Sequence, residues 1–366
     1  MMDFFKSRFR RKGKAMNSLH DFWEWFQENE NSFYHVVKQH DDIERNFFNH
    51  LKPKLNQLRE GIWYLTGMYD EEVAELVITP DGVIRNIAFV EKLVQAAPKL
   101  PKWKFTALKP AIDIKNMSIE MAGYTFSNDS LSFYPVDNSD YPDEIEIHII
   151  HNDGEEQNIS TIETGVYIFL DNYLGELNAA TIIDELRVTP VSKAEKELIP
   201  IAKLKDFLIW REKEFVEKYT GIRNDTENDN YMALEGTLNN GLPLLALVNS
   251  DLLNWDSKAS HPWITVVEIK YDGGQNNGMP NEKDYQLLNE IEDQLMLELK
   301  DVEGYLNIGR QTADSLREVY FACIDFRKPS EVLYALQKDY VGYSVEIEFE
   351  IYKDNYWQSF DRFKNH

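Results

Sequence analysis

The chain has 366 residues, 43% of them hydrophobic and 13% aromatic, which is enough apolar material for the cores of about two domains. Its 39 basic and 63 acidic side chains give a formal net charge of -24. This charge argues against nucleic acid as a partner and favours basic partners, although it also serves solubility.

The N-terminal leader, residues 1–16, has the opposite charge. It contains Lys6, Arg8, Arg10, Arg11, Lys12 and Lys14 against Asp3 alone. We expect a disordered leader; contact with a membrane surface or with the acidic remainder of the chain is the alternative. Neither the leader nor any later stretch has the apolar run of a signal peptide or a membrane span, so we expect a cytoplasmic protein.

The only cysteine, Cys323, lies in the apolar run 319–324 and has no second cysteine for an internal disulfide. The run predicts a buried structural thiol, and an unpaired cysteine suits a reducing compartment.

Residues 17–192 are expected to form an N-terminal α+β domain. Aromatic residues crowd a short helix at 22–26, and apolar residues spaced by three and four predict a second helix at 41–59. The later pattern predicts strands at 62–65, 75–79, 103–108, 118–126, 131–136, 144–150 and 183–188, with helices at 87–97 and 160–174. A connecting helix and a polar linker are expected at 193–230.

Residues 231–366 are expected to form a second domain. Asn240-Gly241 between two apolar runs predicts a β-hairpin over 231–248, since both residues tolerate positive φ. The order strand, helix, two strands, helix, strand then runs from Trp263 to Trp357. This βαββαβ order predicts a ferredoxin-like arrangement, which is an antiparallel sheet with both helices on one face.

One strand carries a candidate metal site. In 144–150, isoleucines at 145, 147 and 149 alternate with polar residues, so Glu146 and His148 should lie on the solvent-facing side, with His151 nearby. A carboxylate and two imidazoles are suitable ligands for a divalent metal ion. A solvated strand face without a metal explains the same pattern.

Motifs for other chemistry are missing from the sequence. It contains no HExxH, GxSxG, paired CxxC or GxGxxG motif. We therefore assign no catalytic residue and expect no cofactor, and the sequence favours a non-catalytic protein.

Short motifs follow one another in the second domain: Glu235-Gly236-Thr237, Leu242-Pro243, Val248-Asn249, His261-Pro262-Trp263, Gly278-Met279-Pro280, Ile291-Glu292-Asp293, Gly309-Arg310-x-Thr312, Asp325 and Asp354-x-x-Trp357. In these motifs the chain resembles the bacterial domain of unknown function 695. The resemblance implies no established activity. It also implies a distant similarity to the RNase E inhibitor B family, small acidic ferredoxin-like proteins that bind an endoribonuclease and restrain it.

Charge, motifs and resemblance together predict an interaction or regulatory module that binds a basic protein partner. The acidic helix expected at 281–300 is one candidate contact surface, and its candidate residues are Glu292 and Asp293. The motif residues Arg310, Asp354 and Trp357 are further candidates for the interaction. The alternative is a metal-dependent hydrolase or small-molecule-binding protein that uses a carboxylate and histidine cluster.

Overall fold

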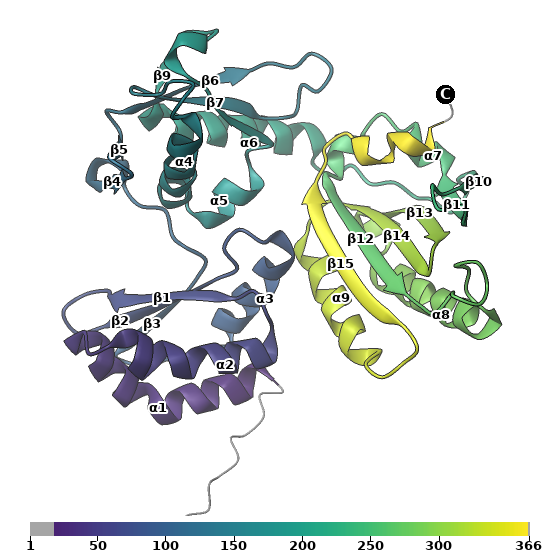
Figure 1. Cartoon of the computed structure of the whole chain (residues 1–366), viewed down its shortest axis with the longest axis horizontal. Coiled ribbons are helices and arrows are strands. Elements are labelled where there is room, and N and C mark those ends of the chain that lie inside the picture. The colour runs from purple at the N-terminus through teal and green to yellow at the C-terminus, as the bar shows by residue number, and fades with distance from the viewer. Residues whose placement is uncertain (1–17, 365–366) are drawn as a thin grey trace, which may run out of the picture. The chain divides into compact units, whose positions relative to one another are not determined.

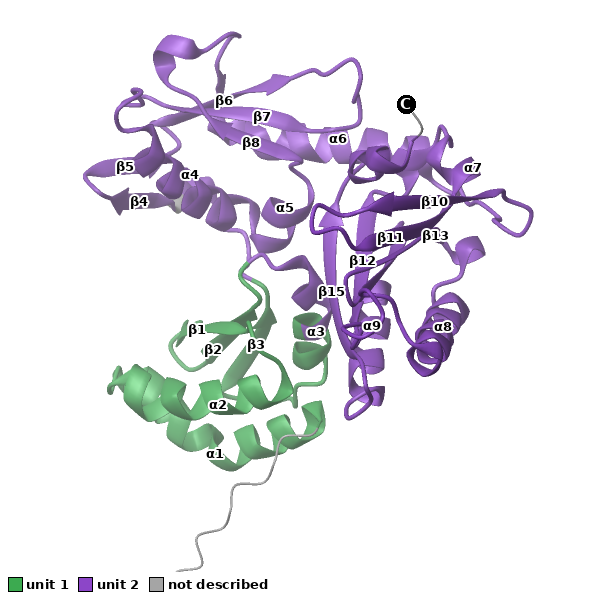
Figure 2. Cartoon of the chain, turned by 45° about the vertical axis from the view of Figure 1, so that its right-hand side comes forward, with its two compact units in different colours: residues 1–81, 90–108 green, residues 82–89, 109–366 purple. Residues whose placement is uncertain are grey.

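The computed structural model describes residues 18–364, so the basic leader lies outside it (Figure 1). The chain is mixed helix and strand, 41% helical and 26% strand, as expected for an α+β protein. It has two compact units: the described part of unit 1 is residues 18–81 and 90–108, and that of unit 2 is residues 82–89 and 109–364 (Figure 2). These units divide the chain differently from the domains expected at 17–192 and 231–366, and those domain limits stay a prediction.

Unit 1 combines helices with a three-stranded sheet. Its elements are α1 (Leu19–Gln39), a π-helical turn (Glu44–Phe48), α2 (Asn49–Leu58), β1 (Trp63–Met68), β2 (Ala74–Thr79) and β3 (Trp103–Ala107). β1 pairs antiparallel with β2, and β2 pairs parallel with β3. The connection from β2 to β3 contains α3 (Ile84–Gln95), through which the boundary between the units passes.

The aromatic residues of α1 form much of the core of unit 1. Phe22, Trp23 and Phe26 are buried, and Phe33 stacks on Phe47 with ring centroids 4.6 Å apart. The first helix extends well beyond the predicted 22–26, because further apolar residues continue the same face to Val37.

The first part of unit 2 is built on a four-stranded sheet in the order β8-β7-β6-β9. Its elements are β4 (Ser118–Met121), β5 (Tyr124–Ser127), β6 (Leu131–Val136), β7 (Glu146–His151), α4 (Ile159–Leu174), α5 (Glu176–Thr181), β8 (Glu185–Val188), β9 (Ile199–Pro200) and α6 (Leu204–Tyr219). Residues of β6, β7, α4 and α6 share one buried core. The predicted strand at 118–126 is instead two strands, since Ala122 and Gly123 turn the chain with φ of 52° and 85°.

The second part of unit 2 is a six-stranded antiparallel sheet in the order β10-β11-β13-β14-β12-β15. Its elements are β10 (Tyr231–Thr237), β11 (Pro243–Asn249), α7 (Ser250–Leu253), β12 (Trp263–Lys270), α8 (Glu282–Glu298), β13 (Tyr305–Ala313), β14 (Leu316–Cys323), α9 (Arg327–Asp339) and β15 (Glu346–Lys353). The predicted hairpin is confirmed, because β10 pairs directly with β11.

The two faces of this sheet differ. Arg317 of β14 contacts α8 and Phe349 of β15 contacts α9, and both are on the same side, because they pair with Ile269 and Val267 of β12. Part of the opposite face is covered by a short 3-10 helix, Gln358–Phe363, in a core with Ile264. Side chains on both faces of the central strands are therefore packed against other elements, the helices α8 and α9 on one side and the 3-10 helix on the other.

Cys323 is fully buried, which confirms the prediction of a structural thiol. Burial raises its pKa to about 12, so the thiolate does not form at neutral pH.

Gly309 fixes a bulge in β13. The pairing with β14 shifts between Asn307 and Gly309, and Gly309 has φ of 139°. A Cβ atom added there would lie 2.2 Å from the carbonyl oxygen of Leu247 and 2.7 Å from the Cα of Val248. Because both neighbours are backbone atoms of β11, only glycine fits between the strands.

We expect Gly309→Ala to lower the free energy of unfolding by about 2–4 kcal/mol, since the strands must separate to admit the methyl group. Urea unfolding followed by circular dichroism measures the change. Gly236→Ala in β10 is the matched control, because its added Cβ would approach no atom closer than 3.9 Å. Equal unfolding midpoints for the two variants would contradict the close approach at Gly309.

Candidate functional site

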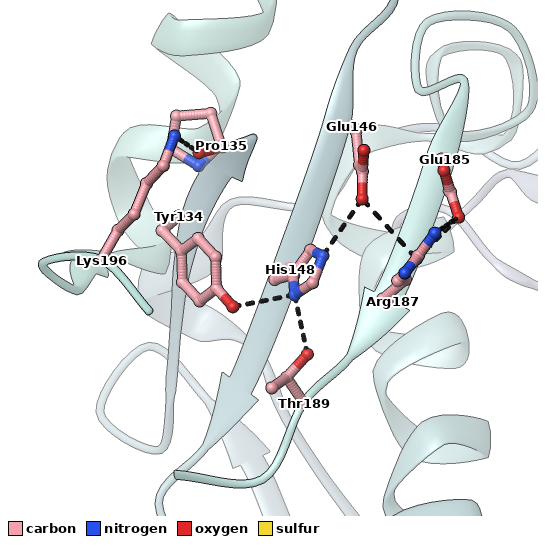
Figure 3. Close-up of polar contacts among 8 residues, drawn as sticks. All are labelled: Tyr134, Pro135, Glu146, His148, Glu185, Arg187, Thr189 and Lys196. Atoms are coloured by element: carbon pink, nitrogen blue, oxygen red, sulfur yellow. Dashed lines mark hydrogen bonds and ion pairs between the residues drawn. The ribbon is translucent and has the colours of Figure 1, made fainter. Parts of the chain in front are cut away.

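The structure brings Glu146 and His148 of β7 together (Figure 3). His148 Nε2 lies 3.2 Å from Glu146 Oε1, and His148 Nδ1 lies 2.8 Å from the Tyr134 hydroxyl and 2.9 Å from Thr189 Oγ1. With the proton on Nε2 donated to the carboxylate, Nδ1 is left to accept from a hydroxyl. A carboxylate, imidazole and hydroxyl in this order can orient the ring and polarise the hydroxyl.

The surroundings of His148 are more enclosed than a solvated strand face. Tyr134 is only 1% exposed, and Ile150, on the same face of β7, is fully buried. Arg187 Nε also lies 3.6 Å from Glu146 Oε1, so the carboxylate already has two partners. The hydrogen-bonded group thus has an evident role in joining β6, β7 and the end of β8.

His151 is not part of this group. It is buried, its Nε2 lies 3.0 Å from the carbonyl oxygen of Thr125, and its Nδ1 accepts from the amide of Asp153. Because β7 continues through His151, which lies three positions after His148, the His151 side chain emerges on the opposite face of the strand. Among residues 18–364, no group of three His, Cys, Asp or Glu side chains is arranged to hold a metal ion.

Glu292 of α8 points into the fold. Its carboxylate lies 2.8 Å from Arg310 and 3.7 Å from Arg317. Arg317 is 2% exposed and also donates to Asn289 at 2.9 Å. The neighbouring Asp293 is exposed, so the two acidic residues predicted as one contact surface lie in different environments.

Asp354 and Trp357 hold the short helix 358–363 in place. The carboxylate of Asp354 accepts from the amides of Gln358 and Ser359, each at 2.9 Å, and so caps the start of that helix. Trp357 is 1% exposed and donates from Nε1 to the carbonyl oxygen of His261 at 2.9 Å. Its ring is therefore a core side chain and not part of an exposed surface.

His261 is buried beside this tryptophan. Ser260 Oγ lies 2.6 Å from the carbonyl oxygen of Ser257 and 2.7 Å from His261 Nδ1. Because the serine proton is donated to Ser257, Nδ1 of His261 carries the proton of the neutral ring. Its Nε2 finds no partner among the described residues. Burial, with a smaller contribution from Arg223, lowers the pKa of His261 to about 4.

Three glutamates lie side by side on the sheet face opposite α8 and α9. Glu268 of β12 pairs directly with Glu318 of β14 on one side and with Glu348 of β15 on the other. Directly paired residues project from the same face of a sheet. We refer to Glu318, Glu268 and Glu348 as the glutamate row.

Positive charge beside the glutamate row comes from Lys270, which also attracts Glu268 and Glu346, and from Arg85, which lines the same hollow as Glu268 and Glu348. Lys270 forms an ion pair with Glu348, and Gln311 donates to Glu318. Glu346 and Glu350 extend the acidic surface along β15, and both are exposed. Among the described residues, neither of these two nor Glu268 forms an ion pair.

Comparison with known families gives a match that covers the glutamate row and His261. Residues 230–363 match a family of unknown function (DUF695). The match starts one residue before Tyr231, the predicted start of the second domain, and it includes the glutamate row and His261. No curated protein and no solved structure matches the chain. In the described part of the chain, no helix has the length and apolar content needed to span a membrane.

Sequence reasoning did not identify the glutamate row. The alternation of Glu346, Glu348 and Glu350 in the sequence was a usable signal for an acidic strand face. Glu268 and Glu318, however, are far apart in sequence, and only the register of β12 with β14 in the DUF695 region brings them together.

We expect Glu292→Gln to lower the free energy of unfolding by about 2–4 kcal/mol, because it leaves the buried Arg317 without its counter-charge. Asp293→Asn, one residue further along α8, should change it by less than about 0.5 kcal/mol. Thermal unfolding of both variants measures the difference. Equal stability of the two would mean that Glu292 does not hold Arg317.

We expect His261 to stay neutral in the folded protein well below pH 6. The unfolded chain takes up this proton near pH 6.5 and the folded chain only near pH 4, so the free energy of unfolding falls as pH drops through this window, by about 3 kcal/mol in total. Imidazole ¹⁵N spectra of histidine-labelled protein at pH 5, with the His261 signal assigned from a His261→Gln variant, should show the His261 ring neutral. A protonated His261 ring at that pH would contradict the buried site.

Proposed function

We propose that the DUF695 region is a non-catalytic interaction module that binds a basic segment of a protein partner. The glutamate row is the observation that carries this proposal. Like charges directly opposite each other in a sheet are destabilising by a few tenths of a kcal/mol to about 1 kcal/mol per pair. Two such pairs meet at Glu268.

A cationic segment over this surface removes the repulsion. Lysine or arginine side chains placed between the carboxylates neutralise the row and form charge-assisted hydrogen bonds. The net charge of -24 adds a long-range attraction that speeds the encounter with a basic partner. Acidic surface near the row, at Glu346 and Glu350, offers further contacts along the same strand.

The fold type of the DUF695 region, its wider family likeness and the cellular location of the protein are further parts of this proposal. The order β13-β14-β12-β15, with α8 and α9 on one face, supports a ferredoxin-like domain preceded by the β10–β11 hairpin. Such a domain in an acidic chain supports the suggested likeness to the RNase E inhibitor B family. The single buried cysteine supports a cytoplasmic location. The metal-dependent hydrolase gains no support from His151, which faces away from Glu146 and His148.

We expect the double variant Glu268→Gln, Glu318→Gln to be more stable and to bind a polycation more weakly. Removing the repulsion should raise the melting temperature by about 1–4 °C. Affinity for a fluorescein-labelled octalysine peptide should fall by about threefold to thirtyfold, since two charge contacts are lost. Thermal unfolding and fluorescence anisotropy measure the two effects.

The matched control is Glu214→Gln with Glu217→Gln, two changes on α6 that alter the net charge equally. General attraction to the acidic chain would weaken binding equally in both double variants, and that result would refute a docking role for the glutamate row. A Glu268→Gln, Glu318→Gln variant that gains stability but binds the peptide as tightly as the control variant would also refute that role.

A further inference from the structure

A cavity of about 300 Å³ lies within unit 2, away from the glutamate row. It is lined by α5 and α6, by the start of β12, and by the turn between β14 and α9. Its lining combines polar side chains with apolar ones, and the apolar ones include Ile182, Phe215, Trp263 and Phe326. Trp263 and Phe326 pack edge to face with centroids 4.8 Å apart. A concave apolar site with a few polar groups is the usual form of a small-molecule site.

Two polar clusters hold the walls of this cavity. Asp184 accepts from the amide of Ile145 at 2.7 Å and from Asn355 at 3.2 Å, and it forms a 2.8 Å ion pair with Lys353. The second cluster is centred on the carboxylate of Asp143. It accepts from the hydroxyls of Tyr219 and Tyr356, at 2.6 and 2.8 Å, and it pairs with Lys218. The cavity is thus preformed by bonds between residues far apart in sequence.

The polar groups facing the cavity indicate which ligand it takes. Asp143 and Lys353 are committed to the two clusters, and the carboxylate of Asp325 accepts from the amides of Arg327 and Lys328 at the start of α9. Glu212 and the side-chain oxygen of Asn178 accept no hydrogen bond from any described residue. Arg327, which also lines the cavity, lies 3.5 Å from the carboxylate of Asp325. Each cation of the lining thus has a carboxylate partner, and Glu212 is the charged group of the lining that forms no ion pair with a described residue.

We propose that this cavity binds a small organic cation, a primary amine joined to an aromatic or branched aliphatic body. The ammonium group donates to Glu212 and to the side-chain oxygen of Asn178, and the apolar body packs against Phe215 and Trp263. A volume of about 300 Å³ is at the low end for small-molecule sites, which favours a compact ligand. Glu212 repels an anionic ligand of the same shape, and the two cations of the lining, Arg327 and Lys353, already have carboxylate partners.

The test uses the full chain and three probes of similar shape: 2-phenylethylamine, 2-phenylethanol and 3-phenylpropionate. Saturation-transfer NMR and calorimetry at millimolar probe concentration should detect the amine, with the alcohol bound more weakly and the carboxylate not bound. Glu212→Gln should weaken binding of the amine about tenfold or more. Glu214→Gln is the matched control, because it makes the same charge change two residues along α6 at a position that does not line the cavity.

A second variant tests the location without touching the charge. Val216 lines the cavity and is 54% exposed, so Val216→Trp fills the site from its rim without disturbing the core. It should abolish binding of the amine and leave the melting temperature unchanged within about 2 °C. The proposal is overturned by equal binding of the three probes, by undetectable binding of the amine, or by equal affinities of the Glu212→Gln and Glu214→Gln variants.

Discussion

The register of β12 between β14 and β15 is the constraint on which the DUF695 region depends. Because side chains alternate from face to face, this register decides at once what lies under the helices and what faces away from them. It places Arg317 beneath α8 and Phe349 beneath α9, and it places three glutamates in a row on the reverse side. A slip of one residue would bury the carboxylates and expose the aromatic ring.

Several residues that carry the family resemblance are explained by folding. Glu292 neutralises a buried arginine, Asp354 caps a short helix, and Trp357 fixes that helix to the strand that begins after His261. Polar groups in such enclosed positions are costly when unpaired, so each is held by a specific partner. In this chain, these three motif residues therefore mark packing arrangements.

Helices and strands whose apolar residues recur at a regular spacing could be predicted from the sequence. The pairing of strands that are far apart in the sequence could not. The hairpin at Asn240-Gly241 and the helix starting after Asn281 follow from local chemistry, namely positive φ and side-chain capping. The side of the sheet on which the His151 side chain lies depends on whether β7 ends before His151 or includes it. A difference of one residue in the end of the strand therefore moves this side chain to the other face. Glu268 and Glu318 become neighbours only through strand pairing, which no local pattern encodes.

The position of β15 at the end of the six-stranded sheet has a further consequence. An edge strand exposes backbone groups that can pair with the edge of another sheet, and proteins protect such edges with charge. Glu346, Glu348 and Glu350 place a negative charge at three alternate positions of β15, while Arg85 and Gln337 donate to the carbonyl oxygens of Phe349 and Ile347. The same carboxylates that suit a basic ligand therefore also protect the strand from joining a second copy of itself and help to keep the folded chain free of aggregation.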